Sequence, residues 1–381
     1  MERPRTHLAI VGCGFVADYY LATLPMHPEL HVTGLVDRLP DRAALLSRVY
    51  GFPVYRNLEE LLADPKVQIV LNLTNPREHH AVTRAALSAG KHVYSEKPLA
   101  METSCAADLV ALAKSSDLLL AAAPCSLLGE TAQTLWRAVR RGAVGPVRLV
   151  YAEMDDGMLH KMNFRNWVTP TGVSWPVKDE LQTGCTVEHA GYSLTWLVGF
   201  FGPVESVTAF STVLVPDKDV GFQIDQMAAD FSVGVLRFVS GVIGRITTSI
   251  FATHNHAIRV FGDRGTLSID DCWKPRTPVH LQRRVSFAGR SAELPWRSEV
   301  SLVGDPELRR RTPKRLKKVD FCLGPLDMVA ALRERRSPRL SARYVLHVAE
   351  LVLAIHNARE NGVSVKLRSR FDPVDPMPWA R

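Results

Sequence analysis

The chain lacks the features of secreted and membrane proteins. Only six of its 381 residues are cysteine, and no two of them form a C-x-x-C pair, which argues against a disulfide framework. No uninterrupted apolar run approaches the roughly 18 residues that a membrane span requires. The opening residues, "MERPRTHLAIVGCGF", carry charges but no apolar signal-peptide core. We therefore expect a cytoplasmic protein with reduced, mostly buried thiols and no membrane partner.

Acidic residues are absent from one segment that accounts for most of the net charge. The formal net charge is +8, and "RRRTPKRLKK" (309–318) alone holds seven cationic residues. One basic loop is a weaker footprint than a whole basic face, so a nucleic-acid partner is not expected. The segment is interpreted as a solvated loop, with phosphate contact or anion steering as the alternative.

Motifs of several other enzyme classes are also missing. The sequence contains no phosphate-binding loop ending in G-K-S or G-K-T, and no Ser–His–Asp arrangement stands out. His254 and His256 lie two residues apart, but we find no carboxylate or cysteine that completes a set of metal ligands with them. Asp155 and Asp156 are interpreted as a turn rather than a cation site. No metal site is therefore predicted.

At 381 residues the chain is long enough for two domains, each with its own core. Its 46% hydrophobic and 23% charged residues are ordinary for a soluble globular protein. In the first third of the chain, short apolar runs alternate with helical patterns. The expected strands are 7–11, 31–36, 67–73, 91–95 and 118–124, and the expected helices are 16–25, 41–49, 77–89 and 102–115. This α/β alternation predicts a Rossmann domain over residues 1–125, with a doubly wound parallel sheet.

The pattern changes after residue 125. A helix at 130–141, a strand at 147–154 and an apolar helix at 185–199 precede a series of strands without helices between them. These strands are expected at 204–214, 228–239, 242–251, 256–262 and 265–270, and two late helices at 325–335 and 341–360. The pattern predicts an α+β domain over 126–381 with a large, mostly antiparallel open sheet.

The turn "AIVGCGFVA" has the glycine spacing of a dinucleotide site. Gly12 allows a tight turn, Gly14 lets a pyrophosphate approach the backbone, and Ala17 keeps the next helix close to the sheet. The start of that helix, at Phe15 and Val16, offers free N–H groups to the anion.

Asp37 ends the second expected strand, 20 residues after Ala17. A carboxylate at this position accepts hydrogen bonds from the ribose hydroxyls, which favours NAD, because the 2′-phosphate of NADP would meet a negative charge. Arg38 follows directly and could bind that phosphate instead. NAD is predicted, with NADP as the alternative.

These motifs resemble those of the Gfo/Idh/MocA oxidoreductases, the family of glucose-fructose oxidoreductase and inositol dehydrogenase. "LTNPREH" after the third strand, "AGKHVYSEKPLA" after the fourth and "IRVFGDRGTL" further on extend the likeness over nearly the whole chain. The resemblance implies a two-domain enzyme, commonly a dimer or tetramer built through the open sheet. It implies oxidation or reduction of hydroxyl and keto groups on sugars, sugar nucleotides and cyclitols.

The resemblance also implies roles for particular residues. The lysine of the family's E-K-P motif corresponds to Lys97, beside the nicotinamide and the reacting C–O group, with Glu96 preceding it. Thr74, Asn75 and His79 are implied as neighbours of the cofactor ribose and nicotinamide.

A lysine suits the E-K-P position, because a cation stabilises the alkoxide that develops as hydride leaves the carbon. The resemblance further implies that the peptide bond between Lys97 and Pro98 is cis.

The second family signature, D-x-G-x-H, is altered. Aligned on Gly191, this chain reads "HAGYS", with His189 in place of the aspartate and Ser193 in place of the histidine. On a helix these positions share a face one turn apart, so His189 is predicted to relay the proton. A structural histidine is one alternative. Proton transfer by Glu188 or Tyr192 is another, although Glu188 projects about 100° away from His189 on an α-helix.

The segment 160–180 mixes hydrogen-bond donors with tryptophans. Fixed donors and aromatic faces suit a sugar ring, and a cation suits a phosphate. The predicted substrate-binding residues are Lys97, Arg165, Trp167, Glu188, His189 and Tyr192. A surface loop whose tryptophans cover the domain edge is the alternative.

The sequence thus predicts an NAD(P)-dependent oxidoreductase that acts on one hydroxyl or keto carbon of a carbohydrate-like substrate, with Lys97 and His189 in proton transfer. Two alternatives stay open. One is a non-catalytic dinucleotide-binding regulator of the same fold. The other is a glycosidase that uses tightly held NAD and releases no net NADH.

Overall fold

The computed structural model describes residues 6–221, 223–224, 226–313 and 319–381. The chain forms two compact units. The first comprises Met1–Cys125, Asn163–Glu180 and Asp320–Ala349, and the second comprises Ser126–Met162, Leu181–Val319 and Glu350–Arg381. The range 126–381, predicted as one domain, therefore contains two segments that pack with the first unit.

The first unit is built on a five-stranded sheet. Its strands are β1 (Thr6–Val11), β2 (Leu30–Val36), β3 (Ile69–Asn72), β4 (His92–Ser95) and β5 (Leu120–Ala122). They lie in the order β2-β1-β3-β4-β5, and every neighbouring pair is parallel. The predicted doubly wound sheet is confirmed. Because these neighbouring strands are parallel, the loops after β1, β2 and β3 lie at the same edge of the sheet, where the strand order reverses.

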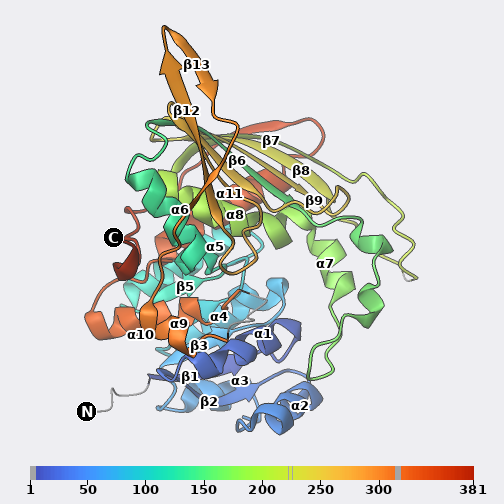
Figure 1. Ribbon diagram of the computed structural model, residues 1–381. Helices are drawn as coiled ribbons and strands as arrows, with labels where there is room; N and C mark the ends of the chain where they lie inside the picture. The colour runs from blue at the N-terminus through green and yellow to red at the C-terminus, as the bar shows by residue number, and fades with distance from the viewer. Residues whose placement is uncertain (1–5, 222, 225, 314–318) are drawn as a thin grey trace. The chain divides into compact units, whose positions relative to one another are not determined.

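Helices connect these strands, as labelled in Figure 1. They are α1 (Phe15–Thr23), α2 (Pro40–Tyr50), α3 (Leu58–Ala63), α4 (His79–Ser88) and α5 (Thr103–Ser115), with short 3₁₀ turns at Leu24–Met26 and Pro76–Glu78. α3 was not expected; its N-terminus is capped by Asn57, whose side chain accepts the N–H of Glu60. α10 (Leu323–Glu334), from late in the chain, packs against β4 and β5.

The second unit contains a ten-stranded sheet in the order β13-β12-β11-β10-β6-β9-β8-β7-β15, with β14 paired to β12. Its strands are β6 (Val147–Asp155), β7 (Val204–Thr212), β8 (Phe231–Phe238), β9 (Ile243–Ser249), β10 (Ile258–Gly262), β11 (Gly265–Ile269), β12 (Val279–Phe287), β13 (Arg290–Glu293), β14 (Ser298–Val300) and β15 (Val363–Lys366). The sheet is mostly antiparallel, as predicted, but β6 and β9 run parallel. The β12–β13 hairpin extends beyond the rest of its sheet (Figure 1).

Several helices complete the fold. They are α6 (Glu130–Arg140), α7 (Val177–Thr183), α8 (Gly191–Phe201), α9 (Pro306–Arg311) and α11 (Ala342–His356). In the second unit, α8 packs against β6, and α6 packs against β12. The basic segment was predicted as a loop, but its first residues belong to α9, where Asp305 caps the helix N-terminus. Its residues 314–318 lie outside the described part. In the described residues, we find no helix with the length and apolarity needed to span a bilayer.

Candidate active site

The glycine turn lies between the ends of three strands of the first unit. Gly12 has φ +99°, and a Cβ there would come within 2.6 Å of the carbonyl carbon of Leu73, so only glycine fits. Its N–H donates to the carbonyl of Val36 at 2.9 Å. Gly14, by contrast, has open space where a Cβ would point.

Asp37 is held beside this turn, as the sequence predicts. Its carboxylate accepts the N–H of Cys13 at 2.7 Å and the N–H of Leu39 at 2.8 Å. Burial and the nearby Asp37 charge raise the pKa of the Cys13 thiol to about 12, which keeps the thiol neutral. Arg38 is exposed, and its guanidinium lies 3.9 Å from a carboxylate oxygen of Glu78.

The turn has the shape that a dinucleotide needs. Gly14 is the N-cap residue of α1 and has no side chain that could accept the first helical N–H groups, at Phe15 and Val16. Ala17 is fully buried and lets α1 approach the sheet. Asp37 keeps unused lone pairs for further hydrogen bonds. These residues fit a pyrophosphate at the helix N-terminus and a ribose at the carboxylate.

Glu96 fixes the backbone of the E-K-P loop. This buried carboxylate accepts the hydroxyl of Tyr20 at 2.7 Å and the N–H of Lys97 at 3.0 Å. Its own N–H donates to the carbonyl of Asn72 at 2.8 Å. The Lys97–Pro98 peptide bond is cis, which confirms that expectation. Lys97 itself is half-buried at the end of β4.

His79 joins the E-K-P loop to the loop after β3. Its Nδ1 lies 2.6 Å from the carbonyl oxygen of Pro98, and its Nε2 lies 2.9 Å from that of Thr74. Burial lowers the pKa of His79, although both carbonyls favour the charged form. The imidazole therefore holds the two loops together, and its predicted contact with the cofactor remains a prediction.

Asn72 organises the same loop and was missed by the sequence reasoning. Its side chain is fully buried, donates to the carbonyl of His79 and the hydroxyl of Thr83, and accepts the hydroxyl of Thr74 at 2.7 Å. The available signal was an asparagine inside the apolar run "VQIVLNL", where a buried amide needs partners.

The segment 163–180 belongs to the first unit, not to the second as expected. The hydroxyl of Thr171 donates to Asp18 in α1, and the amide of Asn75 donates to Asp179. These bonds fasten the middle and the C-terminal end of the segment to the Rossmann domain, and they use one N–H of the Asn75 amide.

Arg165 and Trp167 lie in this segment. Arg165 is exposed, with its guanidinium carbon 5.0 Å from the centre of the Phe164 ring. Trp167 packs edge-on against Trp175 at a ring separation of 5.1 Å. The predicted contact of Arg165 and Trp167 with the substrate stays a prediction, and so does its alternative, a surface loop that covers the domain edge.

His189 lies in a π-helical segment, Thr186–Ala190, directly before α8. The α-helical spacing used to separate Glu188 from His189 therefore does not apply, and both side chains are buried. Ser193, in the position of the family histidine, is also buried and donates to the carbonyl of Ala190. π turns occur often at functional sites.

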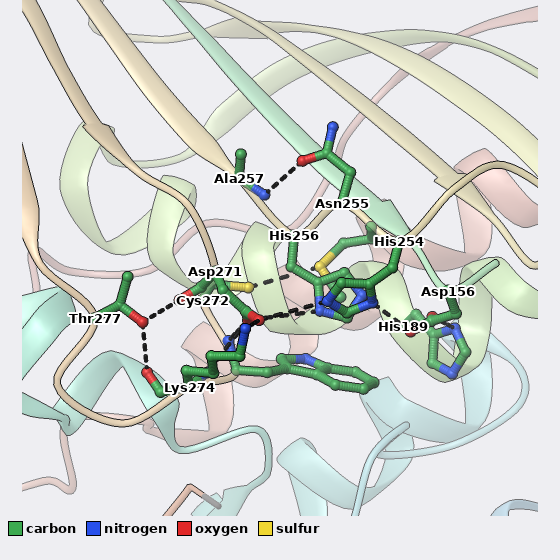
Figure 2. Close-up of polar contacts among 12 residues, drawn as sticks. Asp156, His189, His254, Asn255, His256, Ala257, Asp271, Cys272, Lys274 and Thr277 are labelled. Carbon is green, nitrogen blue, oxygen red and sulfur yellow. Dashed lines mark hydrogen bonds and ion pairs between the residues drawn. The ribbon is translucent and has the colours of Figure 1, made fainter. Parts of the chain in front are cut away.

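A carboxylate that the sequence reasoning had assigned to a turn contacts His189. Nδ1 of His189 lies 2.7 Å from Oδ2 of Asp156, which follows β6, and Nε2 of His256 lies 2.9 Å from Oδ1 of the same residue (Figure 2). Burial alone would raise the pKa of Asp156, but the charge and hydrogen bonds of His189 and His256 lower it well below its ordinary value. The aspartate is therefore ionised at neutral pH.

Trp273 packs over this group. Its ring lies 5.6 Å from that of His189, 4.8 Å from that of Tyr192 and 4.5 Å from that of His256. This packing fixes the orientation of the His189 ring. A fixed orientation agrees both with a proton relay and with a purely structural role for this histidine.

His254 and His256 have a carboxylate beside them, so the prediction that no carboxylate completes a set of metal ligands with them is wrong. One ligand atom from each of Asp156, His254 and His256 lies within 4.8 Å of the others. The residues around the two histidines do not indicate this group, because Asp156 follows a different strand, 100 residues before His256.

Two family models match the chain. Residues 6–123 match the model described as an oxidoreductase family with an NAD-binding Rossmann fold. Residues 132–268 match the model of the GFO/IDH/MocA C-terminal domain. The two matches together span well over half of the chain.

Individual proteins are similar over most of the chain. It is 26% identical to the trans-1,2-dihydrobenzene-1,2-diol dehydrogenase of Bos taurus over 273 residues, which cover 70% of this chain and 75% of the bovine protein. It is 26% identical to the myo-inositol 2-dehydrogenase of Thermotoga maritima over 267 residues, 69% of this chain and 75% of that enzyme. An aldose-aldose oxidoreductase from Caulobacter crescentus has the same fold, with a TM-score of 0.70 at 22% identity over 96% of this chain and 100% of that chain.

Proposed function

Since the chain belongs to the Gfo/Idh/MocA family of oxidoreductases, we propose that it transfers hydride between a nicotinamide and one hydroxyl or keto carbon of a sugar, sugar nucleotide or cyclitol. Its family makes it an NAD(P)-dependent dehydrogenase or reductase. The names of its relatives, an inositol dehydrogenase and an aldose oxidoreductase, support a polyhydroxylated substrate. The observation that carries the proposal is the E-K-P loop, in which buried Glu96 holds the backbone of Lys97.

The bound nicotinamide supplies or accepts the hydride. Lys97 donates a hydrogen bond from Nζ to the reacting oxygen and stabilises its negative charge. Asn72, His79 and Glu96 position that lysine through the backbone contacts of the two loops. The backbone of Lys97 is therefore held in place before the substrate arrives, which lowers the cost of positioning the ammonium group.

We assign the second proton-handling role to His189. Its Nδ1 faces the Asp156 carboxylate at 2.7 Å. A carboxylate on one ring nitrogen fixes the tautomer and stabilises the imidazolium, so that Nε2 is the nitrogen that exchanges a proton. Glu188, Tyr192, Arg165 and Trp167 complete the proposed substrate contacts.

The chain is further proposed to prefer NAD and to form a homodimer or homotetramer through its open sheet. Asp37 supports the cofactor preference. On β8 and the turn after it, Val235 and Val239 are 48% and 60% exposed, which supports contact through that sheet. A monomeric mass in solution by light scattering would contradict the assembly. The cytoplasmic location stays a prediction.

The experiment that tests the function compares Lys97→Ala with the wild type on a panel of cyclitols, aldoses and nucleotide sugars. The variant should bind the dinucleotide normally but lose about 10²–10⁴ in rate, because proton transfer and charge stabilisation are removed. Nicotinamide absorbance measures turnover, and dinucleotide fluorescence measures binding. Lys66→Ala, an exposed lysine outside the loops, is the control and should match the wild type.

The possible outcomes distinguish the proposed oxidoreductase from the two alternative functions. Wild-type turnover by Lys97→Ala would remove Lys97 from the mechanism. Glycoside cleavage without net NADH would indicate the NAD-assisted glycosidase. Dinucleotide binding without any substrate-dependent change across the panel would favour the non-catalytic regulator.

A further inference from the structure

Two imidazoles and a carboxylate meet in the second unit at the ends of separate strands. Asp156 directly follows β6, and His254 and His256 precede β10. Backbone pairing between Asp155 and Asn255 sets these two strand ends side by side. The backbone of the sheet therefore brings the three residues to one place.

The distances are close to those of a coordination sphere. One ligand atom from each of Asp156, His254 and His256 lies within 4.8 Å of the others, and Nε2 of His256 is 2.9 Å from Oδ1 of Asp156. In a tetrahedral zinc site, bonds of 2.0–2.2 Å place neighbouring ligand atoms roughly 3.3 Å apart. The Asp156–His256 pair is already within this spacing, and His254 has to move closer to complete the site.

The rings of His254 and His256 lie close together. Their ring centres are 4.2 Å apart, with planes tilted by 56°, and Figure 2 shows both rings on the same side of the cluster, near Asp156. A cation bound by both rings and by Asp156 accounts for this close approach of the two rings.

A second carboxylate supports the arrangement from outside. Oδ1 of Asp271 lies 3.7 Å from Nδ1 of His256, on the opposite side of the ring from Asp156. A carboxylate behind a ligating histidine orients the ring and raises its basicity. Asp271 is occupied elsewhere: it accepts the N–H groups of Trp273 and Lys274, and the Lys274 ammonium lies 3.2 Å away. Oδ2 of Asp271 also lies 3.5 Å from Nε2 of His254, so this carboxylate contacts both histidines from outside the three proposed ligands.

The burial of the three residues leaves one side open. The side chain of His256 is fully buried, that of Asp156 nearly so, and that of His254 is 52% exposed. Three protein ligands with one solvent-facing side are typical of sites that keep a position for water or a ligand oxygen.

We propose that Asp156, His254 and His256 form a binding site for one divalent transition-metal ion of the Zn²⁺ type. Imidazole and carboxylate ligands suit Zn²⁺ and its first-row neighbours, and the absence of sulfur among the three disfavours copper(I). The ion binds the side of Asp156 that faces His256, while the other oxygen keeps its contact with His189. The alternative is a hydrogen bond between Asp156 and His256 with no ion.

The test uses the full chain, stripped with a chelator and titrated with Co²⁺, whose visible absorption rises strongly on leaving the aqueous octahedral environment. We expect one saturable ion per chain, displaced by Zn²⁺. His254→Ala should lose the signal, and its exposed side chain makes misfolding an improbable cause. Asp271→Asn should weaken binding by about 10–100-fold. His280→Ala, a histidine on β12 outside the cluster, should titrate like the wild type.

The proposal is overturned if the wild type shows only the spectrum of aqueous cobalt, or if His254→Ala and His280→Ala bind alike. Sulfur-to-cobalt bands that persist in His254→Ala would assign the ion to cysteine and also overturn it. Circular dichroism and the thermal midpoint of each variant separate loss of binding from loss of fold. The titration needs neither dinucleotide nor substrate, so its result is independent of the Lys97 experiment.

Discussion

Gly12 and Gly14 lie two residues apart in one turn, yet alanine should affect them differently. At Gly12, φ is +99° and a Cβ would lie 2.6 Å from the carbonyl of Leu73, so Gly12→Ala should destabilise the first unit by at least about 1–3 kcal/mol. At Gly14 the space is open, so Gly14→Ala should fold normally but bind the dinucleotide more weakly, because its methyl group points where the pyrophosphate approaches.

Thermal unfolding and dinucleotide titration of both variants provide the measurement. A Gly14→Ala variant that binds NAD as tightly as the wild type would show that no cofactor backbone approaches this position. A Gly12→Ala variant of unchanged stability would contradict the close packing between the turn and Leu73.

Single residues could be predicted where a local motif defines the role. Gly12 and Asp37 occupy the expected turn and strand end, and the bond before Pro98 is cis. Asn72 and Asp156 could not be predicted, because their function depends on partners from other loops. Nothing in the neighbouring sequence of Asp156 indicates that His189 and His256 approach it.

At the scale of elements, short buried strands could be predicted and exposed ones could not. Most residues of β1 and β3 are apolar and buried on both faces, which is the pattern of a strand covered on both sides. All four residues of β13 are exposed, and most of the second half of β12 is exposed too, so neither shows the alternation that marks a strand. The π segment before α8 was also missed, because one inserted residue hardly changes the hydrophobic periodicity of a helix.

A hydrogen bond joins the ends of β1 and β2, because the N–H of Cys13 donates to the carboxylate of Asp37. Asp37→Ser should raise the preference for NADP over NAD by at least about tenfold, since a carboxylate facing the 2′-phosphate costs several kcal/mol. It should also lower the thermal midpoint, because the N–H groups of Cys13 and Leu39 lose their charged acceptor. Dissociation constants for both dinucleotides give the ratio.

Asp41→Ser, an exposed acid in the first turn of α2, serves as the matched control and should leave the ratio unchanged. An equal ratio in Asp37→Ser and the wild type would mean that another group, such as Arg38, determines the choice of cofactor.

At the scale of the whole molecule, element types could be predicted better than their assignment to a unit. The segments 163–180 and 320–349 follow the change of pattern at residue 125 but pack with the first unit. Their attachment depends on contacts such as Thr171 with Asp18 and the ring nitrogen of His27 with Asp320, 2.7 Å apart. Periodicity reports which face of an element is buried, not which sheet covers that face.

Both units contain a histidine whose burial favours the neutral form. Burial lowers the pKa of His79 in the first unit and of His356 in the second. The unfolded chain, with an ordinary histidine pKa near 6.5, then binds more protons than the folded one as the pH falls. Because stability rises with pH wherever the unfolded state binds more protons, each histidine should destabilise the fold progressively below about pH 6.5.

His356→Leu tests this effect, because the buried Nδ1 atom of this half-buried histidine has no hydrogen-bond partner among the described residues. The wild type should lose stability between pH 7.5 and pH 5.5, and the variant should lose less, since it lacks one group that must be protonated on unfolding. Thermal midpoints at both pH values give the difference, with His280→Leu on β12 as the control that should fall as far as the wild type. A drop in His356→Leu as large as that of the control would mean that carboxylates, not buried histidines, govern the acid sensitivity of this protein.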